Sequence, residues 1–350
     1  MTVKVDEFAD RLFKSALGTA EILSIHIGDR MGWYRALAAQ GPATPGELVA
    51  RAGGGERYAR EWLEQQAIAG ILTVGDDGRF VLGEGEAEVL TDESSLAYLA
   101  PMARLFTAAA VQMPALLEAY RTGGGVSWAD FGTDMRESQA DMNRPWFEHA
   151  LPGVLAGLPE LDAVLRRPGA RIADIGCGGG WSTIALARAY PQAHVEGIDI
   201  DAPSIELATR NAAEAGLGDR VAFRHGDAAG LGAEQYDAIF AFECVHDMPR
   251  PVDTLAAARR ALAPGGVVVV MDEAVADSFA PPGDEIEQLM YGFSLLVCLP
   301  DGMAHRPSAG TGTVMRPDTL RRYAREAGFR DLEILPVEDF GFWRFYRLIP

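Results

Sequence analysis

The sequence predicts an α/β protein in which a doubly wound, mostly parallel sheet follows a smaller, mostly helical domain. Three observations support this. The second half alternates short apolar runs with amphipathic helical segments, a glycine-rich stretch closes the first of these runs, and the first hundred residues combine helical patterns with one hairpin. With 350 residues, 48% of them hydrophobic, the chain is long enough for two domains that each bury a core.

The first domain, residues 1–95, has the element order of a winged helix. Thr44, Pro45 and Glu47 make a helix start, since a capping hydroxyl precedes a proline at the first helical position and a glutamate follows three residues after the cap. This short helix leads into a longer one and then into a hairpin over 71–82, where a Gly-Asp-Asp-Gly turn separates two apolar runs.

The longer helix, 56–70, favours packing or dimerisation over DNA recognition. Tyr58, Trp62 and Leu63 are expected on one face. A helix that reads the major groove is normally basic, whereas this one carries two arginines and three glutamates. We therefore expect no nucleic-acid partner for the winged helix.

The second region, residues 96–167, is expected to be a helical connector that contributes to a dimer interface and to a substrate pocket. Residues 94–120 are more apolar than one buried helix face requires, which fits either an internal core or a homodimer interface. Residues 143–170 are helical, punctuated by prolines, and lead the chain into a strand.

The third region, residues 168–350, alternates strands with helices. Strands are expected at 171–176, 194–200, 220–226, 236–242, 266–272, 331–337 and 342–349, and helices at 181–189, 203–215, 252–263 and 317–328. Such a sheet binds ligands beyond the carboxyl ends of its strands. Residues 276–312 are too many for a simple connector and are expected to form a lid insertion with a helical apolar half and a mobile glycine-rich half.

The glycine-rich stretch Asp-Ile-Gly-Cys-Gly-Gly-Gly, residues 174–180, follows the first strand of this region. A dinucleotide site requires G-x-G-x-x-G, so that the pyrophosphate rests on a helix N-terminus. Counted from Gly176, the third glycine of that pattern would fall on Trp181, so the pattern fails. The spacing is instead Asp174-x-Gly176-x-Gly178-x-Gly180, with acidic residues at the ends of the next two strands.

With these motifs the sequence resembles the class I S-adenosylmethionine-dependent methyltransferases, and the winged helix in front makes it similar to bacterial small-molecule methyltransferases of two-domain build. The resemblance implies a Rossmann-like seven-stranded sheet that binds S-adenosyl-L-methionine at the glycine loop. Asp199 would accept hydrogen bonds from the ribose hydroxyls, and Asp227 would contact the adenine amino group, although either could merely cap a helix. The implied cofactor-binding residues are Asp174, Gly176, Cys177, Gly178, Gly180, Asp199, Ile200, Gly226, Asp227, Ala228, Phe242 and Glu243.

Candidate catalytic residues follow the fourth and fifth strands of this region. Methyl transfer is an in-line displacement, so the enzyme mainly aligns the acceptor; if the acceptor is a hydroxyl, an imidazole that is neutral near pH 7 suits removal of its proton. We expect His246 to act as base or orienting group, Asp247 or a nearby carboxylate to hold its ring, and Glu273 to orient the acceptor. The alternatives are a helix cap or a solvated side chain for His246, a capping acid for Asp247 and an exposed strand-end carboxylate for Glu273. An aromatic-accepting pocket could be lined by Trp33, Trp146, Met290, Tyr291 and Phe293.

Composition narrows the partners. A formal net charge of -19 argues against general attraction to nucleic acid or an anionic membrane, and no run approaches the length of a membrane span. Three cysteines without a paired motif, and no metal-ligand spacing, predict a cytoplasmic protein without a metal. We expect methyl transfer to a hydroxyl of a small aromatic or polyketide-like molecule. Transfer to nitrogen or carbon, and a DNA-binding regulator that senses the cofactor, are the alternatives.

Overall fold

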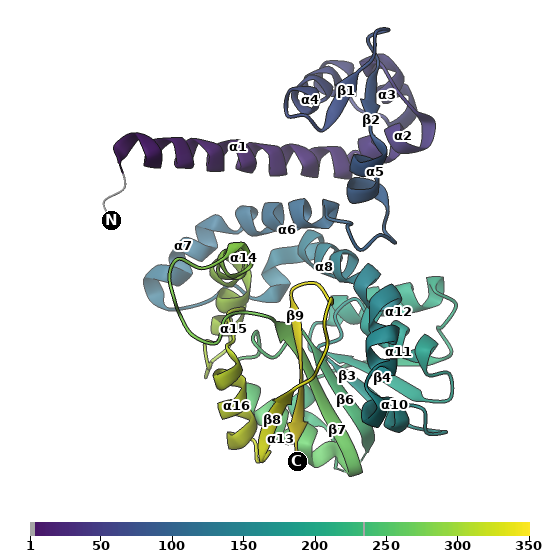
Figure 1. Ribbon diagram of the computed structural model, residues 1–350, viewed down its shortest axis with the longest axis vertical. Coiled ribbons are helices and arrows are strands. Elements are labelled where there is room, and N and C mark those ends of the chain that lie inside the picture. Colours follow the sequence, from purple (N-terminus) through teal and green to yellow (C-terminus); the bar gives the residue numbers. More distant parts are fainter. Residues whose placement is uncertain (1–3, 234) are drawn as a thin grey trace. The chain divides into compact units, whose positions relative to one another are not determined.

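The computed structural model describes residues 4–233 and 235–350, which divide into two compact units, 1–108 and 109–350. The boundary between them lies in helix α6 (Ala100–Val111). Figure 1 labels the elements of both units. Within the described ranges, no helix combines the length and the apolar content that a bilayer crossing needs.

The first unit contains the predicted winged helix. Its elements are α1 (Val5–Arg30), α2 (Trp33–Gln40), α3 (Pro45–Ala52), α4 (Glu56–Ile68), β1 (Leu72–Val74), β2 (Phe80–Leu82) and α5 (Glu84–Thr91), and β1 pairs antiparallel with β2. The predicted start of α3 is confirmed, because the Thr44 hydroxyl accepts from the Glu47 backbone N–H at 3.3 Å and the Glu47 carboxylate accepts from the Thr44 N–H at 2.8 Å.

The prediction of which residues share one face of α4 is partly wrong. Trp62 and Leu63 are buried, but Tyr58 is 79% exposed. The buried stripe also runs through Ala59 and Gln66, and at about 100° per residue Tyr58 lies well to the side of it. The helix places Trp62 in the core and leaves Tyr58 in solvent.

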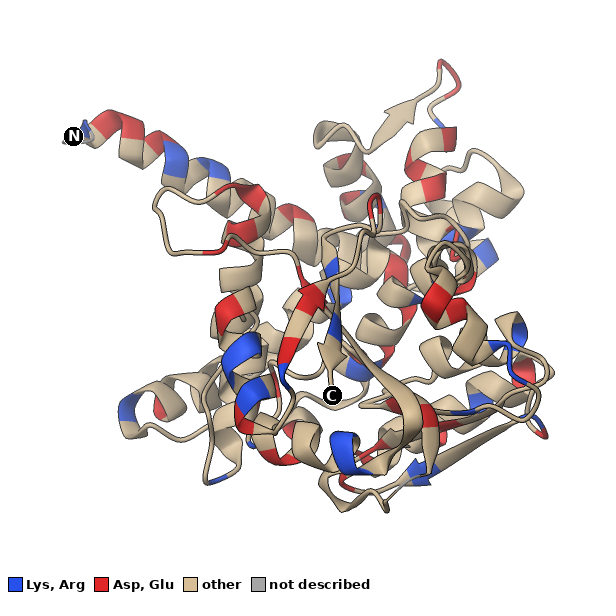
Figure 2. Cartoon of the chain, turned by 60° about the horizontal axis from the view of Figure 1, so that its bottom comes forward, with Lys and Arg blue, Asp and Glu red and all other residues tan. Residues whose placement is uncertain are grey.

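The charges of α4 are already paired within the helix. Arg57 pairs with Glu61, and Arg60 lies 3.5 Å from Glu56, each across one helical turn. Figure 2 shows acidic and basic segments interspersed along the helices rather than gathered into a basic face. These pairs leave α4 without the surplus of cations that phosphate binding requires.

The second unit opens with helices that lie within the expected helical connector, although the bounds of one of them were not predicted. They are α7 (Met113–Thr122), α8 (Trp128–Pro145), the π-helical turn η1 (Trp146–Ala150), α9 (Leu151–Ala156) and α10 (Pro159–Leu165). Helix α8 is polar over most of its length and contains Gly132 with φ of 80°, which interrupts its regular geometry. Because its apolar residues do not form a continuous stripe, the sequence pattern did not give the bounds of this helix.

The predicted seven-stranded sheet is confirmed (Figure 1). Its elements are β3 (Arg171–Ile175), α11 (Trp181–Ala189), β4 (His194–Asp199), α12 (Ala202–Glu214), β5 (Val221–His225), η2 (Ala228–Gly230), β6 (Tyr236–Phe242), α13 (Pro251–Ala261), β7 (Leu262–Glu273), α16 (Pro317–Glu326), β8 (Asp331–Ile334) and β9 (Trp343–Ile349). The strand order is β5-β4-β3-β6-β7-β9-β8, and only the pairs that include β9 are antiparallel.

The sheet is buried on both faces. Ile172 and Phe240 belong to the cluster that includes residues of α9, α10 and α11, while Ala173 and Ile239 belong to the cluster that includes residues of α13 and α16. Because side chains alternate across a strand, neighbours in sequence enter opposite cores. Because β3 to β7 are parallel, their carboxyl ends and the loops that follow them lie at one edge of the sheet.

The insertion after β7 is helical in its apolar half, as predicted: α14 (Glu285–Phe293), the π-helical turn η3 (Ser294–Cys298) and α15 (Leu299–Ala304). Its glycine-rich half is hydrogen-bonded to the loop after β6. The Ala309 N–H donates to the Pro249 carbonyl at 2.8 Å, and the Gly312 N–H donates to the His246 carbonyl at 3.1 Å. The predicted mobile half is thus held against the strand-end loop.

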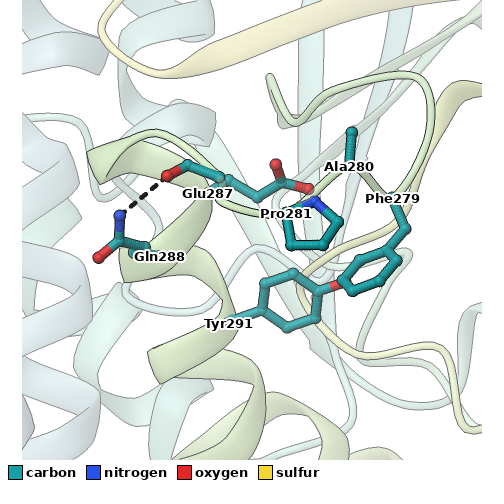
Figure 3. Close-up of a pocket in the computed structure, with 7 residues that line it drawn as sticks. Phe279, Ala280, Pro281, Glu287, Gln288 and Tyr291 are labelled. Carbon is teal, nitrogen blue, oxygen red and sulfur yellow. Dashed lines mark hydrogen bonds between the residues drawn. The ribbon is translucent and has the colours of Figure 1, made fainter. Parts of the chain in front are cut away.

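Three of the five residues expected to line an aromatic pocket are buried within their own units. Trp33 lies in the core of the first unit, and Met290 and Phe293 are buried. Tyr291 lines a cavity of about 110 Å³ beside Phe279 (Figure 3). This cavity is smaller than the cavity of about 150 Å³ that admits benzene, and of the five residues only Tyr291 lines it, so an aromatic-accepting pocket remains a prediction.

Candidate active site

The glycine loop after β3 packs tightly on its own protein and leaves one glycine facing open space. A Cβ on Gly176, Gly179 or Gly180 would come within 2.8 Å of a side-chain atom of Cys244, Ala140 or Ala208, respectively. A Cβ on Gly178 would meet nothing within 4 Å, and its φ is 50°. Three glycines therefore let the loop lie close to β6, α8 and α12, and Gly178 presents its backbone to a ligand.

Asp174 holds the two ends of this loop together through hydrogen bonds. Its side chain is fully buried, and one oxygen accepts from the Ser182 and Thr183 hydroxyls at 2.6 Å each, which ties the first turn of α11 to the end of β3. Burial raises the pKa of Asp174 to about 6. The other oxygen is buried without a hydrogen-bond partner among the described residues. Cys177 is also buried, and this raises the pKa of its thiol.

Asp199 lies at the end of β4, beside the loop. Its carboxylate accepts from the Gly178 N–H and from the Asp201 N–H, both at 2.8 Å, and burial raises its pKa. Each carboxylate oxygen has a second lone pair for a ligand hydroxyl. Arg136 of α8 pairs with Asp201 at 2.5 Å, so an ion pair joins α8 to the loop after β4. Ile200 in the same loop is 68% exposed.

Asp227 caps the short helical turn η2. One oxygen accepts from the Ala229 N–H at 2.8 Å and the other lies 3.3 Å from Arg250. The capping alternative raised by the sequence is thus present, and contact with adenine remains a prediction. The Gly226 N–H donates to the Asp199 carbonyl at 2.8 Å, so the loops after β4 and β5 lie together, and Ala228 is buried.

His246 is buried among three carboxylates. Its Nδ1 is hydrogen-bonded to Asp272 at 2.7 Å and lies 3.2 Å from Glu273, while Asp247 lies 3.1 Å from Nε2. His246, Asp272 and Glu273 are each at most 5% exposed, whereas the Asp247 side chain is 27% exposed. The helix-cap and solvent alternatives for His246, and the exposed alternative for Glu273, are wrong.

These carboxylates change the protonation of the site. Burial lowers the pKa of His246, but Asp247, Asp272 and Glu273 together raise it well above its usual value. The sequence led us to expect a neutral imidazole near pH 7, and the structure instead favours the cation. Burial also raises the pKa of Glu273 well above its usual value, which favours the neutral form of this carboxyl group.

Glu243 receives donors that the sequence did not reveal. Asn143 and Trp343 donate to its carboxylate, and the Gln139 amide donates at 3.3 Å. These donors come from α8 and from the start of β9, about a hundred residues away on either side. Phe242 is buried, with its ring stacked on Phe240 at 5.3 Å, so its side chain belongs to the core.

The cluster also contains possible metal ligands. One ligand atom from each of His246, Asp272 and Glu273 lies within 4.8 Å of the others, and the same holds for His246, Asp247 and Cys298. The sequence spacing could not show this, since the residues follow different strands and a helix. The absence of a metal remains an expectation.

Two family models match the chain. One, described as a methyltransferase domain, matches residues 166–298, and the other, described as an Rv2258c-like winged HTH domain, matches residues 19–92. The 27-O-demethylrifamycin SV methyltransferase of Amycolatopsis mediterranei (strain S699) is 30% identical over 189 residues, which are 50% of this chain and 69% of that protein. The chain belongs to the S-adenosylmethionine-dependent methyltransferases. The ubiquinone biosynthesis O-methyltransferase of Aromatoleum aromaticum (strain DSM 19018 / LMG 30748 / EbN1) is 31% identical over 173 residues, 48% of this methyltransferase and 67% of the relative.

Solved structures share the fold of this methyltransferase over nearly the whole chain. The mitomycin 7-O-methyltransferase MmcR superimposes with a TM-score of 0.71 at 20% identity, covering 97% of both chains. Human N-acetylserotonin methyltransferase in complex with SAM gives 0.72 at 17% identity, covering 100% of this chain and 99% of that one. The methyltransferase family model and the rifamycin relative support the enzyme interpretation over the regulator alternative, in agreement with the ion pairs within α4.

The site fits S-adenosylmethionine, the cofactor of this family. Gly178 faces open space, and the Asp199 carboxylate beside it retains acceptor capacity for hydroxyls. Exposed Ile200 provides an apolar surface at the same edge. The loop contains no Lys or Arg between residues 174 and 180, which suits a ligand without phosphate groups.

Proposed function

We propose that this methyltransferase transfers a methyl group from S-adenosylmethionine to a hydroxyl group of a small aromatic or polyketide-like molecule. The observation that carries the proposal is the buried hydrogen bond between His246 and Asp272 at the edge of the sheet where the glycine loop lies. An oriented imidazole suits an acceptor that must lose a proton. The names of the rifamycin, ubiquinone and mitomycin relatives support a small-molecule hydroxyl acceptor.

In this proposal Gly178, Asp199, Ile200, Gly226, Asp227 and Ala228 hold the nucleoside part of the cofactor, and Asp174, Gly176, Cys177, Gly180, Phe242 and Glu243 shape the site around its methionine part. When bound, the cofactor supplies an electrophilic methyl carbon on a positively charged sulfur. The acceptor oxygen forms a bond to that carbon while the carbon–sulfur bond breaks, and the bonding electrons stay on sulfur.

His246, once it is in its neutral form, takes up the proton that the acceptor oxygen loses. Asp272 holds Nδ1, so Nε2 is the nitrogen that faces the acceptor. Asp247 lies near Nε2, but its nearer oxygen makes no hydrogen bond with any described residue, and the side chain is partly exposed. An acceptor hydroxyl can therefore replace Asp247 beside Nε2, and Glu273 holds the other side of the ring.

Transfer of a labelled methyl group tests this function. The purified protein is incubated with S-adenosylmethionine carrying a radioactive methyl group and with a panel of phenols, each matched by the corresponding aniline. We expect label in the phenols and much less in the anilines. Labelling of the anilines alone would contradict the hydroxyl assignment and leave the cofactor assignment standing.

We also propose a cytoplasmic homodimer formed largely by the first 120 or so residues. The three cysteines are free thiols, which suits a reducing compartment. In α1, Leu12, Phe13 and Leu17 are 55 to 65% exposed, an apolar surface that a second copy could cover.

Light scattering is expected to give the mass of a dimer at micromolar concentration. Introducing two charges into the apolar surface, with Phe13→Glu and Leu17→Glu, is expected to shift the protein toward monomer, because buried charges are costly in an apolar interface. Lys14→Glu on the same helix is the control, since it changes charge without removing apolar surface. A wild-type monomer would contradict the proposal.

A further inference from the structure

Glu243 has a backbone and a set of partners that are unusual for a strand-end residue. It follows β6 with φ of 48°, a left-handed conformation that is costly for a residue with a side chain. Its carboxylate receives N–H donors from Asn143, Gln139 and Trp343, while the residue stays partly exposed. A strained backbone with three convergent donors indicates that the fold holds this carboxylate in one defined position.

The carboxylate lies beside the glycine loop. Its chain neighbour Cys244 is the residue that a Cβ on Gly176 would meet, at 2.7 Å. Its partners Gln139 and Asn143 flank Ala140 on α8, and Ala140 is the residue that a Cβ on Gly179 would meet, at 2.6 Å. Glu243 is thus held between the two elements that pack on the loop, at the end where the methionine part of the cofactor is placed.

The surroundings of Glu243 change the pKa of its carboxyl group. Burial raises its pKa to about 7, against the opposing effects of the Trp343 hydrogen bond and of His246, and Asp272 raises it further. The donors from α8 and β9 are uncharged amide and indole groups. The titratable groups that act on it are therefore His246 and Asp272, both from the strand ends of the same site.

We propose that Glu243 distinguishes the cofactor, which carries a sulfonium charge, from its demethylated product, which has a neutral thioether, by pairing as a carboxylate with the sulfonium. The inference rests on the cofactor placement proposed above. It concerns cofactor selectivity rather than the acceptor.

The direction of the pH effect follows from the charge. A bound sulfonium favours the ionised carboxylate and lowers its pKa, so binding below about pH 7 releases a proton. The affinity for S-adenosylmethionine should therefore rise with pH up to about 7 and level off above it. When the methyl group leaves, Glu243 loses its counter-charge, and its pKa returns toward the value of the free protein. The product, S-adenosylhomocysteine, should bind with little dependence on this group.

Titration calorimetry with both compounds tests the inference. Measurements at several pH values, in buffers of different ionisation enthalpy, give the affinity and the number of protons released. Glu243→Gln keeps the size and accepts hydrogen bonds but cannot ionise. We expect it to weaken S-adenosylmethionine binding about tenfold, to change S-adenosylhomocysteine binding by less than about twofold, and to abolish the proton release.

Two further variants serve as a second test and as a control. Trp343→Phe removes a donor that lowers the pKa of Glu243, so the pH at which the affinity levels off should move upward while the preference for the charged compound remains. Glu206→Gln, on the exposed face of α12, removes an equal charge outside the site and should change nothing. Thermal unfolding checks that each variant is folded.

The outcomes separate the inference from the function on which it rests. Equal weakening of both compounds by Glu243→Gln, or proton release that persists in that variant, would overturn the inference and leave the function standing. Failure of the wild-type protein to bind either compound would overturn the proposed cofactor placement and the inference together.

Discussion

His246→Ala and His246→Gln are expected to lower the single-turnover rate of methyl transfer by about 100- to 10,000-fold, while cofactor affinity stays nearly unchanged. The reason is geometric. The imidazole is buried, Nδ1 is fixed by Asp272 at 2.7 Å, and Nε2 is turned toward partly exposed Asp247, so the ring can take a proton only from that side. An acceptor that is already nucleophilic would show a much smaller loss.

The pH dependence of the rate checks the same residue. The carboxylates raise the pKa of His246 well above its usual value, which favours the imidazolium form in the free enzyme. A proton acceptor must be neutral, so the rate at low acceptor concentration should rise as the pH is raised through that pKa. His149→Ala, at an exposed imidazole, is the control. Wild-type rates in both His246 variants would remove His246 from the mechanism and leave Glu273 as the next candidate.

A chelator completes this experiment. Since His246, Asp272 and Glu273 bring possible metal ligands together, the assay is repeated after treatment with EDTA. We expect an unchanged rate, because the proposed chemistry needs only a proton acceptor and alignment. A rate that falls with EDTA and returns with a divalent cation would contradict the expectation of no metal.

The sheet was predictable because its signals are local. Each strand is a short apolar run followed by a helical pattern, and the observed bounds of α11 and β6 coincide with the predicted ones. The glycine spacing and Asp199 are also local signals, since each lies at the end of a run that predicts a strand. Sequence pattern therefore indicated the edge of the sheet at which the site lies.

The contents of the site were less predictable because they depend on long-range contacts. Asp272 follows Met271 after the run of valines in β7, and nothing in its neighbours shows that it meets His246, 26 residues earlier. The donors to Glu243 come from a polar helix without an apolar stripe and from the start of the last strand. The raised pKa of His246 likewise results from three carboxylates that only the fold assembles.

Asp199→Ala is expected to weaken S-adenosylmethionine binding by about 2 to 3 kcal/mol, or about 30- to 150-fold, because the cofactor loses a charge-assisted pair of hydrogen bonds from its ribose. Titration calorimetry measures the affinity, and Glu206→Ala, an exposed acid on the next helix, is the matched control. Unchanged affinity in Asp199→Ala would contradict the ribose assignment.

A loss of affinity alone would not be decisive, because Asp199 also holds the Gly178 and Asp201 N–H groups and its removal can loosen the loop. A cofactor analogue that lacks both ribose hydroxyls separates the two causes in a thermodynamic cycle. If Asp199 binds the hydroxyls, the analogue binds wild type weakly, and the substitution weakens it by clearly less than it weakens the natural cofactor. If Asp199 only supports the loop, the substitution weakens both ligands equally, and the ribose is held elsewhere.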